Sequence, residues 1–379
     1  MSPSRPRSSC PLWSAVVVFI FSLEARAFSV GSGASAACHE LMIHEAFLDY
    51  ICPEGTCSPD LPAGWELYQP DEHLDPATRK IMDSEFGIFS DRVKFSWPVK
   101  LAHYSLREGA RYNDTYGNGI SQFNDLRAIH LADFNQAEHC LRSTMDFGPD
   151  GEGDVSALKR CRGFIEEQIE EAIKAFERSS IQREEMVPVY IEFYGTINVL
   201  LWGGFFHLGR ALHALQDSYS HTIRSDDLSR IYSITNYLSC IQNGKGIDHD
   251  LFGPCHSNAP DRCLASEVEP LHDAATDQTR LLLQAFTQRL IHGDQEAIKN
   301  RLDQALAFQP GCRDSIGYCG SGWVPLFMKE VSLTDDLWIA NAIGCTTTGR
   351  GRDSSATNLL FALLELIFLH RMRRKAARR

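Results

Sequence analysis

The chain has 379 residues, a formal net charge of −12 and hydrophobic side chains at 44% of its positions. Without its first 27 and last 34 residues it keeps 26 basic and 46 acidic side chains. This excess of carboxylates excludes a broad nucleic-acid-binding surface, because such surfaces gain affinity from lysine and arginine at the phosphates.

The first 27 residues have the three parts of a secretory signal peptide. Arg5 and Arg7 precede an apolar run at residues 13–23, and alanines at 25 and 27 suit cleavage. The apolar run is too short to cross a bilayer as a helix. We therefore expect a secreted or cell-surface protein whose mature chain begins near Phe28.

The first helix predicted in the mature chain covers His39 to Ile51, where apolar residues recur three or four positions apart. His39 and His44 are five residues apart and so lie on different faces of that helix. Only one of them is expected to face a functional site.

Two shorter segments follow that carry further candidate side chains. Residues 108–119 have the composition of a turn-rich loop that presents Asp114, and residues 136–142 contain His139. Taken alone, each is more typical of an ordinary loop carboxylate or a surface imidazole.

Residues 154–179 form the clearest amphipathic pattern, with an apolar stripe opposite a row of glutamates. Asp154 is a candidate N-cap for this helix. The next helix is predicted from Val199 to Asp217 and is apolar on nearly all sides, which indicates a central, buried position.

The buried helix carries the strongest functional signal. His213, Asp217 and His221 follow one another at four-residue intervals, and four residues advance a helix by about 400°. His213 and Asp217 therefore share a face and can hold one ion between them. His221 falls where Ser218 and Ser220 indicate that the helix ends. A lone buried histidine is usually a core residue, but three such residues together favour a zinc site, in which Asp217 could bridge two ions.

Helices are also predicted at residues 265–291 and 294–307, while strand-like alternation is scarce. We expect an all-α, multi-helix bundle at residues 28–345. The tail, residues 346–379, resembles a C-terminal sorting or anchor signal. Cys345 precedes an apolar stretch at 359–369 and a basic cluster at 371–379. The alternative is an amphipathic last helix with a solvated basic end.

The chain has twelve cysteines, one of which lies in the signal peptide. If Cys345 belongs to the tail signal, ten remain, and in an oxidising compartment we expect disulfide-stapled loops. Three close spacings suit local bridges, although connectivity cannot be read from a sequence: Cys52/Cys57, Cys255/Cys263 and Cys312/Cys319. The zinc-knuckle spacing of two residues is absent, which leaves histidine and carboxylate as metal ligands.

These residues resemble, in order, the ligands of the zinc-dependent phospholipase C and single-strand nuclease superfamily, an all-helical fold with clustered zinc ions. The resemblance spans most of residues 28–300, and only the His213, Asp217, His221 motif is specific. It implies two or three Zn²⁺ ions and the following ligands: Phe28, His39, Asp114, His139, His213, Asp217 and His221.

Three ligand positions differ from the family pattern. The family has an N-terminal tryptophan where this sequence has Phe28. Asp125 lies nearer to the family spacing before His139 than Asp114 does, but we prefer Asp114 because residues 111–114 resemble the turn in which the family's loop aspartate usually sits. The final histidine and carboxylate have three candidates, of which we favour His249. The candidates are His249 with Asp250, His256, and His272 with Asp277.

The resemblance implies an exported phosphodiesterase, in which metal ions activate a water and Asp114 orients or deprotonates it. The acidic body favours phospholipase C-type cleavage of phospholipid head groups, with contact at a membrane surface. Two alternatives remain open. One is a zinc-dependent single-strand nuclease or nucleotidase, and the other is a non-catalytic, disulfide-braced surface protein.

Overall fold

A computed structural model describes about three fifths of the chain, all of it within one compact unit that covers residues 1–331. The signal peptide, Phe28, Cys345 and the tail lie outside the described residues, so these expectations remain predictions. The described residues are 38–53, 57, 62–65, 79–80, 95–119, 122–178, 184–191, 195–243, 249–257, 260–261, 266–312 and 317–328.

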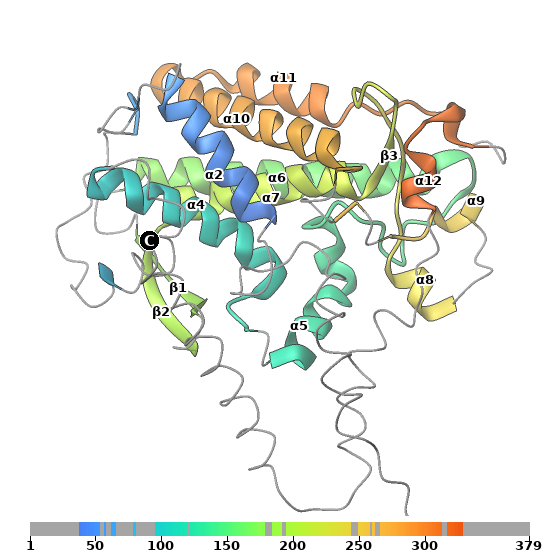
Figure 1. The fold of residues 1–379 in the computed structure, drawn as a ribbon, viewed down its shortest axis with the longest axis horizontal. Coiled ribbons are helices and arrows are strands. Elements are labelled where there is room, and N and C mark those ends of the chain that lie inside the picture. Colours follow the sequence, from blue (N-terminus) through green and yellow to red (C-terminus); the bar gives the residue numbers. More distant parts are fainter. Residues whose placement is uncertain are drawn as a thin grey trace, which may run out of the picture. The chain divides into compact units, whose positions relative to one another are not determined.

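The described part of the chain is mostly helical, in agreement with the predicted class (Figure 1). Six helices form the main body: α2 (Cys38–Ile51), α4 (Trp97–Thr115), α6 (Glu152–Glu177), α7 (Gly203–Ser220), α10 (Glu269–His292) and α11 (Gln295–Ala305). Short helices lie around it: α5 (Phe123–His130), α8 (Leu238–Asn243), α9 (His249–Phe252), α12 (Val324–Phe327), η5 (Asp133–Ala137), η6 (Pro149–Gly151) and η8 (Tyr318–Gly320).

Helix α7 is the central element, as its sequence predicts. It packs against α4, α6 and α10, while α2 lies between α4 and α10 (Figure 1). Phe205, Leu208 and Leu212 are buried with side chains from all of these neighbours. A helix that is apolar on every side buries all of its apolar side chains only when other elements surround it.

Two glycines allow α4 and α7 to cross with their backbones in contact. A Cβ atom at Gly109 would clash with the carbonyl oxygen of Phe206, and one at Gly209 would clash with that of Leu106. Glycine is the residue that permits this approach. The crossing brings Asp114, the second-last residue of α4, close to His213 on α7.

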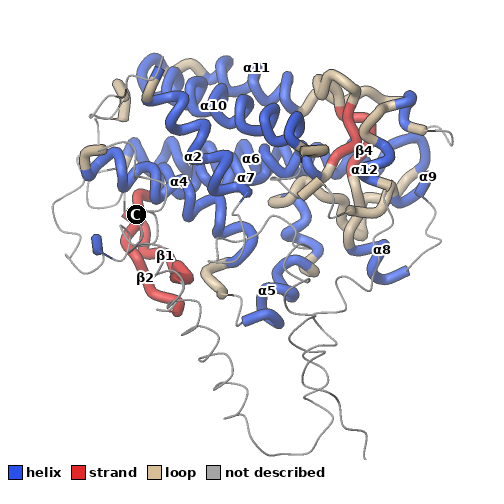
Figure 2. Tube along the Cα trace, viewed as in Figure 1, coloured by secondary structure: helices blue, strands red, loops and turns tan. Residues whose placement is uncertain are grey.

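Small sheets accompany the helices (Figure 2). Strands β1 (Glu184–Ile191) and β2 (Gly195–Trp202) form one antiparallel hairpin, and β3 (Thr222–Arg224) pairs with β4 (Ile231–Ile234). The helix predicted from Val199 therefore begins at Gly203, and Val199 to Trp202 end a strand. A short apolar run fits a strand as well as a buried helix, so periodicity could not separate the two.

Asp154 is not an N-cap, because α6 begins at Glu152 with Gly151 in the left-handed conformation before it. The Asp154 carboxylate instead accepts hydrogen bonds from the backbone nitrogen of Ile234 (2.8 Å) and the hydroxyl of Ser233 (3.1 Å). It ties α6 to β4 rather than capping its own helix.

The segment expected to be a loop around Asp114 is the last part of α4. The helix continues to Thr115 and ends where Tyr116 adopts a left-handed φ of 48°. The glycine at 109 suggested a turn, but it serves the crossing with α7. Asp114 is thus held by helical hydrogen bonds instead of by a mobile turn.

Four disulfides join described cysteines: Cys52–Cys57, Cys140–Cys161, Cys240–Cys255 and Cys312–Cys319. The predicted bridges Cys52–Cys57 and Cys312–Cys319 are confirmed. The bridge from Cys255 to Cys263 is wrong, because Cys255 bonds to Cys240. This many disulfides fits folding in an oxidising environment. Among the described helices, none combines the length and hydropathy needed to span a membrane.

Candidate metal centre

Five buried or nearly buried side chains from three helices and one turn meet beside α7, and we call them the first cluster. They are His39 of α2, Asp114 of α4, His139 in the turn after η5, and His213 and Asp217 of α7. All five are among the ligands predicted from the sequence.

Asp217 is the centre of this cluster, and its two carboxylate oxygens face different partners. One oxygen lies 3.1 Å from Nε2 of His39. The other lies 2.9 Å from Nδ1 of His139 and 2.9 Å from Nε2 of His213. Those two imidazole nitrogens are themselves 3.1 Å apart. One oxygen therefore faces one imidazole nitrogen and the other faces two, so both oxygens have potential partner ligands for a cation.

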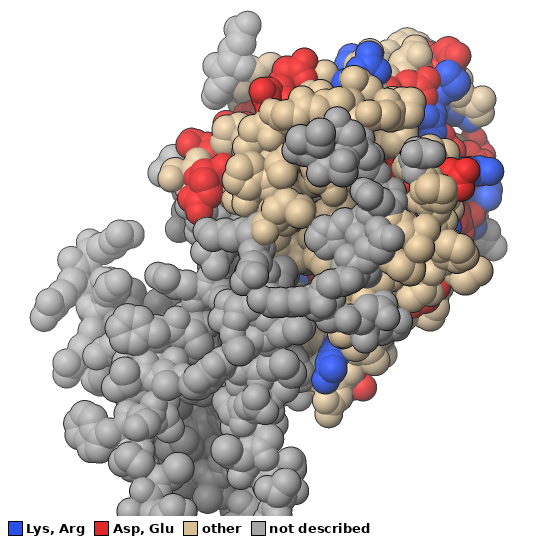
Figure 3. All heavy atoms as spheres, turned by 90° about the vertical axis from the view of Figure 1, so that its right-hand side faces the viewer, with Lys and Arg blue, Asp and Glu red and all other residues tan. Residues whose placement is uncertain are grey.

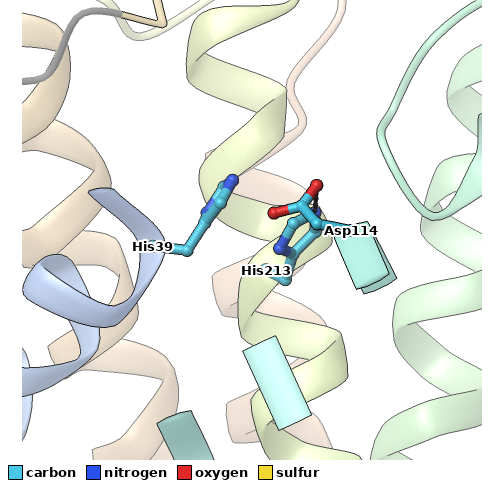
Figure 4. Close-up of side chains that lie close together, drawn as sticks. All are labelled: His39, Asp114 and His213. Atoms are coloured by element: carbon cyan, nitrogen blue, oxygen red, sulfur yellow. Dashed lines mark ion pairs between the residues drawn. The ribbon is translucent and has the colours of Figure 1, made fainter. Parts of the chain in front are cut away.

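Asp114 approaches the same group from the end of α4. One of its oxygens lies 3.8 Å from Nδ1 of His139 and 3.8 Å from Nε2 of His213. Figure 4 shows Asp114 beside His213, with His39 pointing toward both from α2. Ligand atoms of His39, Asp114 and His213 lie within 4.8 Å of one another, close enough to share an ion.

A chain of hydrogen bonds from α7 to α10 fixes the ring of His39. The amide nitrogen of Gln216 donates to the hydroxyl of Thr279 (3.1 Å), so its oxygen accepts from Nδ1 of His39 (2.8 Å). Nε2 of His39 is thereby directed at Asp217. Such outer partners are typical of metal-binding histidines, because they set the tautomer and the ring orientation.

A second cluster lies at the end of α7 and consists of His221, His256 and Asp261. Nε2 of His221 is 3.5 Å from one oxygen of Asp261, and Nε2 of His256 is 3.3 Å from the other. All three side chains are buried. Within the described part of the chain, Nε2 of His256 and both Asp261 oxygens make no hydrogen bond, although buried polar atoms normally do. A cation would satisfy all three.

The end of α7 links the two clusters. The helix stops at Ser220, as the sequence indicates, and His221 is its C-cap. Nδ1 of His221 donates to the backbone carbonyl of His139 (2.6 Å), which leaves Nε2 facing Asp261. One helix therefore supplies ligand atoms to both clusters.

His130 is a further imidazole that the sequence did not single out. It ends α5, and its ligand atom lies within 4.8 Å of those of Asp114 and His139. Gln136 holds this helix end in place, because its side chain donates to the carbonyl of His130 (2.9 Å). Partial burial and the nearby His139 lower the pKa of His130 to about 3, so its ring is neutral and able to bind a metal.

The other candidate histidines have different surroundings. His44 faces away from the first cluster and lies 3.3 Å from His103, which agrees with the prediction that only one histidine of α2 faces a site. His272 lies nearest Glu45 and Asp273. His249 is the first residue of α9, but its side chain is outside the described residues.

The structure thus places His256, an alternative in the sequence analysis, in the second cluster, while the favoured His249 stays an untested prediction. The carboxylate partner of His256, Asp261, was not considered, because it is five residues away and no helix connects the two. Asp125 is exposed on α5, whereas Asp114 reaches the cluster.

A buried ion network holds α2 against α4 next to the first cluster. Glu40, the residue after His39, accepts hydrogen bonds from Arg107 (2.8 Å) and from Arg111 (2.7 and 2.8 Å). Arg111 also pairs with Glu108 at 3.0 Å. These contacts fix the register of α2 and hence the position of His39.

The electrostatics of the first cluster are set by burial and by the charges within it. Burial alone would raise the pKa of Asp217, but the imidazoles of His221, His213 and His39 hold it well below its usual range. Burial and the proximity of His39 keep the pKa of His213 well below its usual value, so this ring is neutral. Burial raises the pKa of Asp114 to about 7, partly opposed by His39 and His139.

Comparison of the chain with protein-family models, with curated proteins and with solved structures gave no match.

Proposed function

We propose that the protein is an exported zinc-dependent phosphodiester hydrolase related to the zinc-dependent phospholipase C and single-strand nuclease superfamily. The observation that carries the proposal is the environment of Asp217, one oxygen of which faces the imidazole nitrogen of His39 while the other faces those of His139 and His213. A single structural ion does not need a carboxylate with donors on both sides.

The donor set fits zinc in kind and number. Histidine nitrogens and carboxylate oxygens are typical zinc ligands, and catalytic zinc commonly has three protein ligands with one open position. The first cluster has donors for two ions that share Asp217. The second cluster has three donors of its own, His221, His256 and Asp261. Two or three ions are therefore proposed.

Zinc ions at these positions would supply charge neutralisation at a phosphate and a water of lowered pKa. The chain's own contribution is to orient that water and receive its proton. Asp114 is proposed for this role, because it is the cluster carboxylate at the margin of the group and its pKa is raised to about 7. A base with a pKa near the working pH is the most effective.

Phospholipid is the proposed substrate, and the surface near His139 supports it. Three large apolar side chains on the segment that carries His139 are exposed: Phe134 (78%), Met145 (73%) and Phe147 (57%). Asp133 accepts hydrogen bonds from the backbone nitrogen and the hydroxyl of Thr144. These bonds hold the backbone at Phe134 close to the backbone at Met145. Exposed apolar groups of this kind mark contact with lipid or protein, and we propose contact with a membrane surface.

A nucleic-acid substrate is the second candidate. On the face seen in Figure 3, basic residues alternate with acidic ones along the margins and form no continuous basic stripe in the visible described part. A single-strand nuclease could still act through stacking residues, which need no basic surface.

Two measurements test the proposal. Metal analysis of the purified protein should find two or three zinc ions per chain, and values below one would contradict it and favour a non-catalytic surface protein. The protein is then incubated with phosphatidylcholine and with single-stranded DNA, each with and without a chelator. Release of a phosphorylated head group that the chelator abolishes is expected, whereas chelator-sensitive activity on DNA alone would establish the nuclease instead.

A further inference from the structure

Three cluster histidines lie neither on α7 nor at its C-cap, and all three are directly next to disulfide-bonded cysteines. Cys38 precedes His39, Cys140 follows His139, and Cys255 precedes His256. The ligands on α7 have no such neighbours. Their spacing is set by the helix itself.

His139 and His256 need another means of positioning, because both lie in irregular backbone. His139 is in a turn, and Cys140 after it adopts a left-handed φ of 47°, which is unfavourable for a residue with a Cβ atom. His256 is held through its backbone nitrogen, which donates to the carbonyl of Asn236 (3.0 Å). Neither histidine lies within a helix or strand.

The two disulfides attach these segments to helices. Cys140 bonds to Cys161 inside α6, and its Cα lies 4.8 Å from that of its partner. Cys255 bonds to Cys240 inside α8, with a Cα separation of 5.7 Å. Each bond thus fixes the residue next to a ligand to a regular element that contributes no ligand to the two clusters.

We propose that the Cys140–Cys161 and Cys240–Cys255 disulfides are positioning elements of the metal centre. The first sets His139 in the first cluster, and the second sets His256 in the second cluster. Tight zinc binding then requires the oxidised protein, so the ions are acquired in the compartment where the disulfides form. This inference rests on the proposed zinc sites.

The chain offers matched controls, since Cys52–Cys57 and Cys312–Cys319 are next to no cluster residue. Three double alanine variants are compared with wild type, with both cysteines of one bond replaced in each. They remove Cys140–Cys161, Cys240–Cys255 or Cys312–Cys319. Zinc per chain, zinc affinity and the visible spectrum of the Co²⁺-loaded protein are measured below the unfolding temperature of each variant.

Loss of a group that orients a ligand typically weakens metal affinity about ten- to hundredfold. We expect that loss in the first cluster without Cys140–Cys161, and in the second cluster without Cys240–Cys255, each with an altered Co²⁺ spectrum. The Cys312–Cys319 variant should keep wild-type affinity at every site. Wild-type zinc affinity and spectrum in both cluster variants, or equal losses in the control, would overturn the inference.

A second measurement covers variants that do not fold. Folded wild type is partly reduced with a phosphine, the opened bonds are identified by alkylation and mass spectrometry, and zinc is titrated after the reductant is removed. Cys240 and Cys255 are half-buried whereas Cys140 and Cys161 are buried, so the second cluster should lose affinity first. Unchanged affinity with Cys240–Cys255 open would contradict the inference. Absence of zinc from wild type would instead refute the proposed function.

Discussion

Replacing Glu40 by glutamine tests the buried network that places His39. Glu40 is 2% exposed, and its partners Arg107 and Arg111 are 1% and 3% exposed. Glutamine keeps the size of the side chain but removes its charge. Two guanidinium groups then stay buried, with Glu108 next to Arg111.

Two estimates of the loss in free energy of unfolding caused by Glu40→Gln agree. Removing one partner of a buried ion pair costs about 3–5 kcal/mol. Burial would raise the pKa of Glu40, but Arg111 and Arg107 outweigh it and lower the pKa from 4.5 to about 2. At roughly 1.4 kcal/mol per pKa unit, this shift corresponds to about 3 kcal/mol. We therefore expect Glu40→Gln to lower the free energy of unfolding by about 3 kcal/mol at neutral pH.

The depressed pKa also fixes the pH dependence. A carboxylate whose pKa is lower in the folded state contributes its full stabilisation of the fold at pH values above its unfolded-state pKa, which is 4.5 for Glu40. That contribution disappears as the pH falls from 4.5 toward 2. The destabilisation caused by Glu40→Gln should shrink over the same window, because the wild-type network loses its charge there.

Urea unfolding at neutral pH and at several lower values measures both effects. The matched control is Glu171→Gln, which removes a carboxylate 2.9 Å from Lys174 on the exposed side of α6. An exposed pair contributes at most about 1 kcal/mol. The reasoning is refuted if Glu40→Gln costs no more than the control, or if its cost is the same at every pH.

Three other predictions follow from the same geometry. Asp217→Asn replaces one of the two proposed bridging oxygens by an amide group that donates hydrogen bonds, so it should remove at least one zinc equivalent per chain. Metal analysis measures this loss, and wild-type zinc stoichiometry would contradict the proposed bridge. Gly109→Ala should lower the free energy of unfolding by about 1–3 kcal/mol in urea unfolding, because its Cβ meets a carbonyl of α7. The control Gly163→Ala, which has open space around it in α6, should raise the free energy of unfolding by about 0.5–1 kcal/mol. Equal effects of the two variants would rule out the close crossing. His130→Ala should change the spectrum of Co²⁺ in the first cluster and weaken binding there, and an unchanged spectrum would exclude His130 as a ligand.

The part of the site that could be predicted is the part fixed by one helix. His213 and Asp217 are four residues apart, and a helix turns that spacing into a shared face without any tertiary information. The buried position of α7 could also be predicted, because its apolar residues cover all sides. Each of these inferences needs only the geometry of a single element.

Asp114 was identified, but in the wrong local structure. Glycine at 109 is normally a signal for a turn, and only the crossing with α7 shows why it lies within a helix. The same lack of tertiary information placed the start of α7 at Val199. These errors concern element boundaries and do not affect the place of Asp114 in the first cluster.

Asp261 and His130 could not be found from spacing, because neither shares a helix with its cluster partners. Asp261 is five residues beyond His256, and His130 reaches Asp114 only because Asn135 and Gln136 fold α5 back upon the turn of His139. Neither is next to a cysteine, which is the signal that other cluster residues share. It was present at His39, His139 and His256, and in each case the histidine belongs to a cluster.

This pairing also explains why a chain with an extensive helical core carries disulfides in its interior. Cys140 and Cys161 are buried within the main core, where apolar packing already stabilises the helices. A crosslink there adds little that packing does not provide, except at the turn that it fixes. That turn carries His139 and, through its carbonyl, orients His221. One covalent bond therefore acts on donors of both clusters, so opening it should disturb the second cluster more than removal of Cys312–Cys319 does.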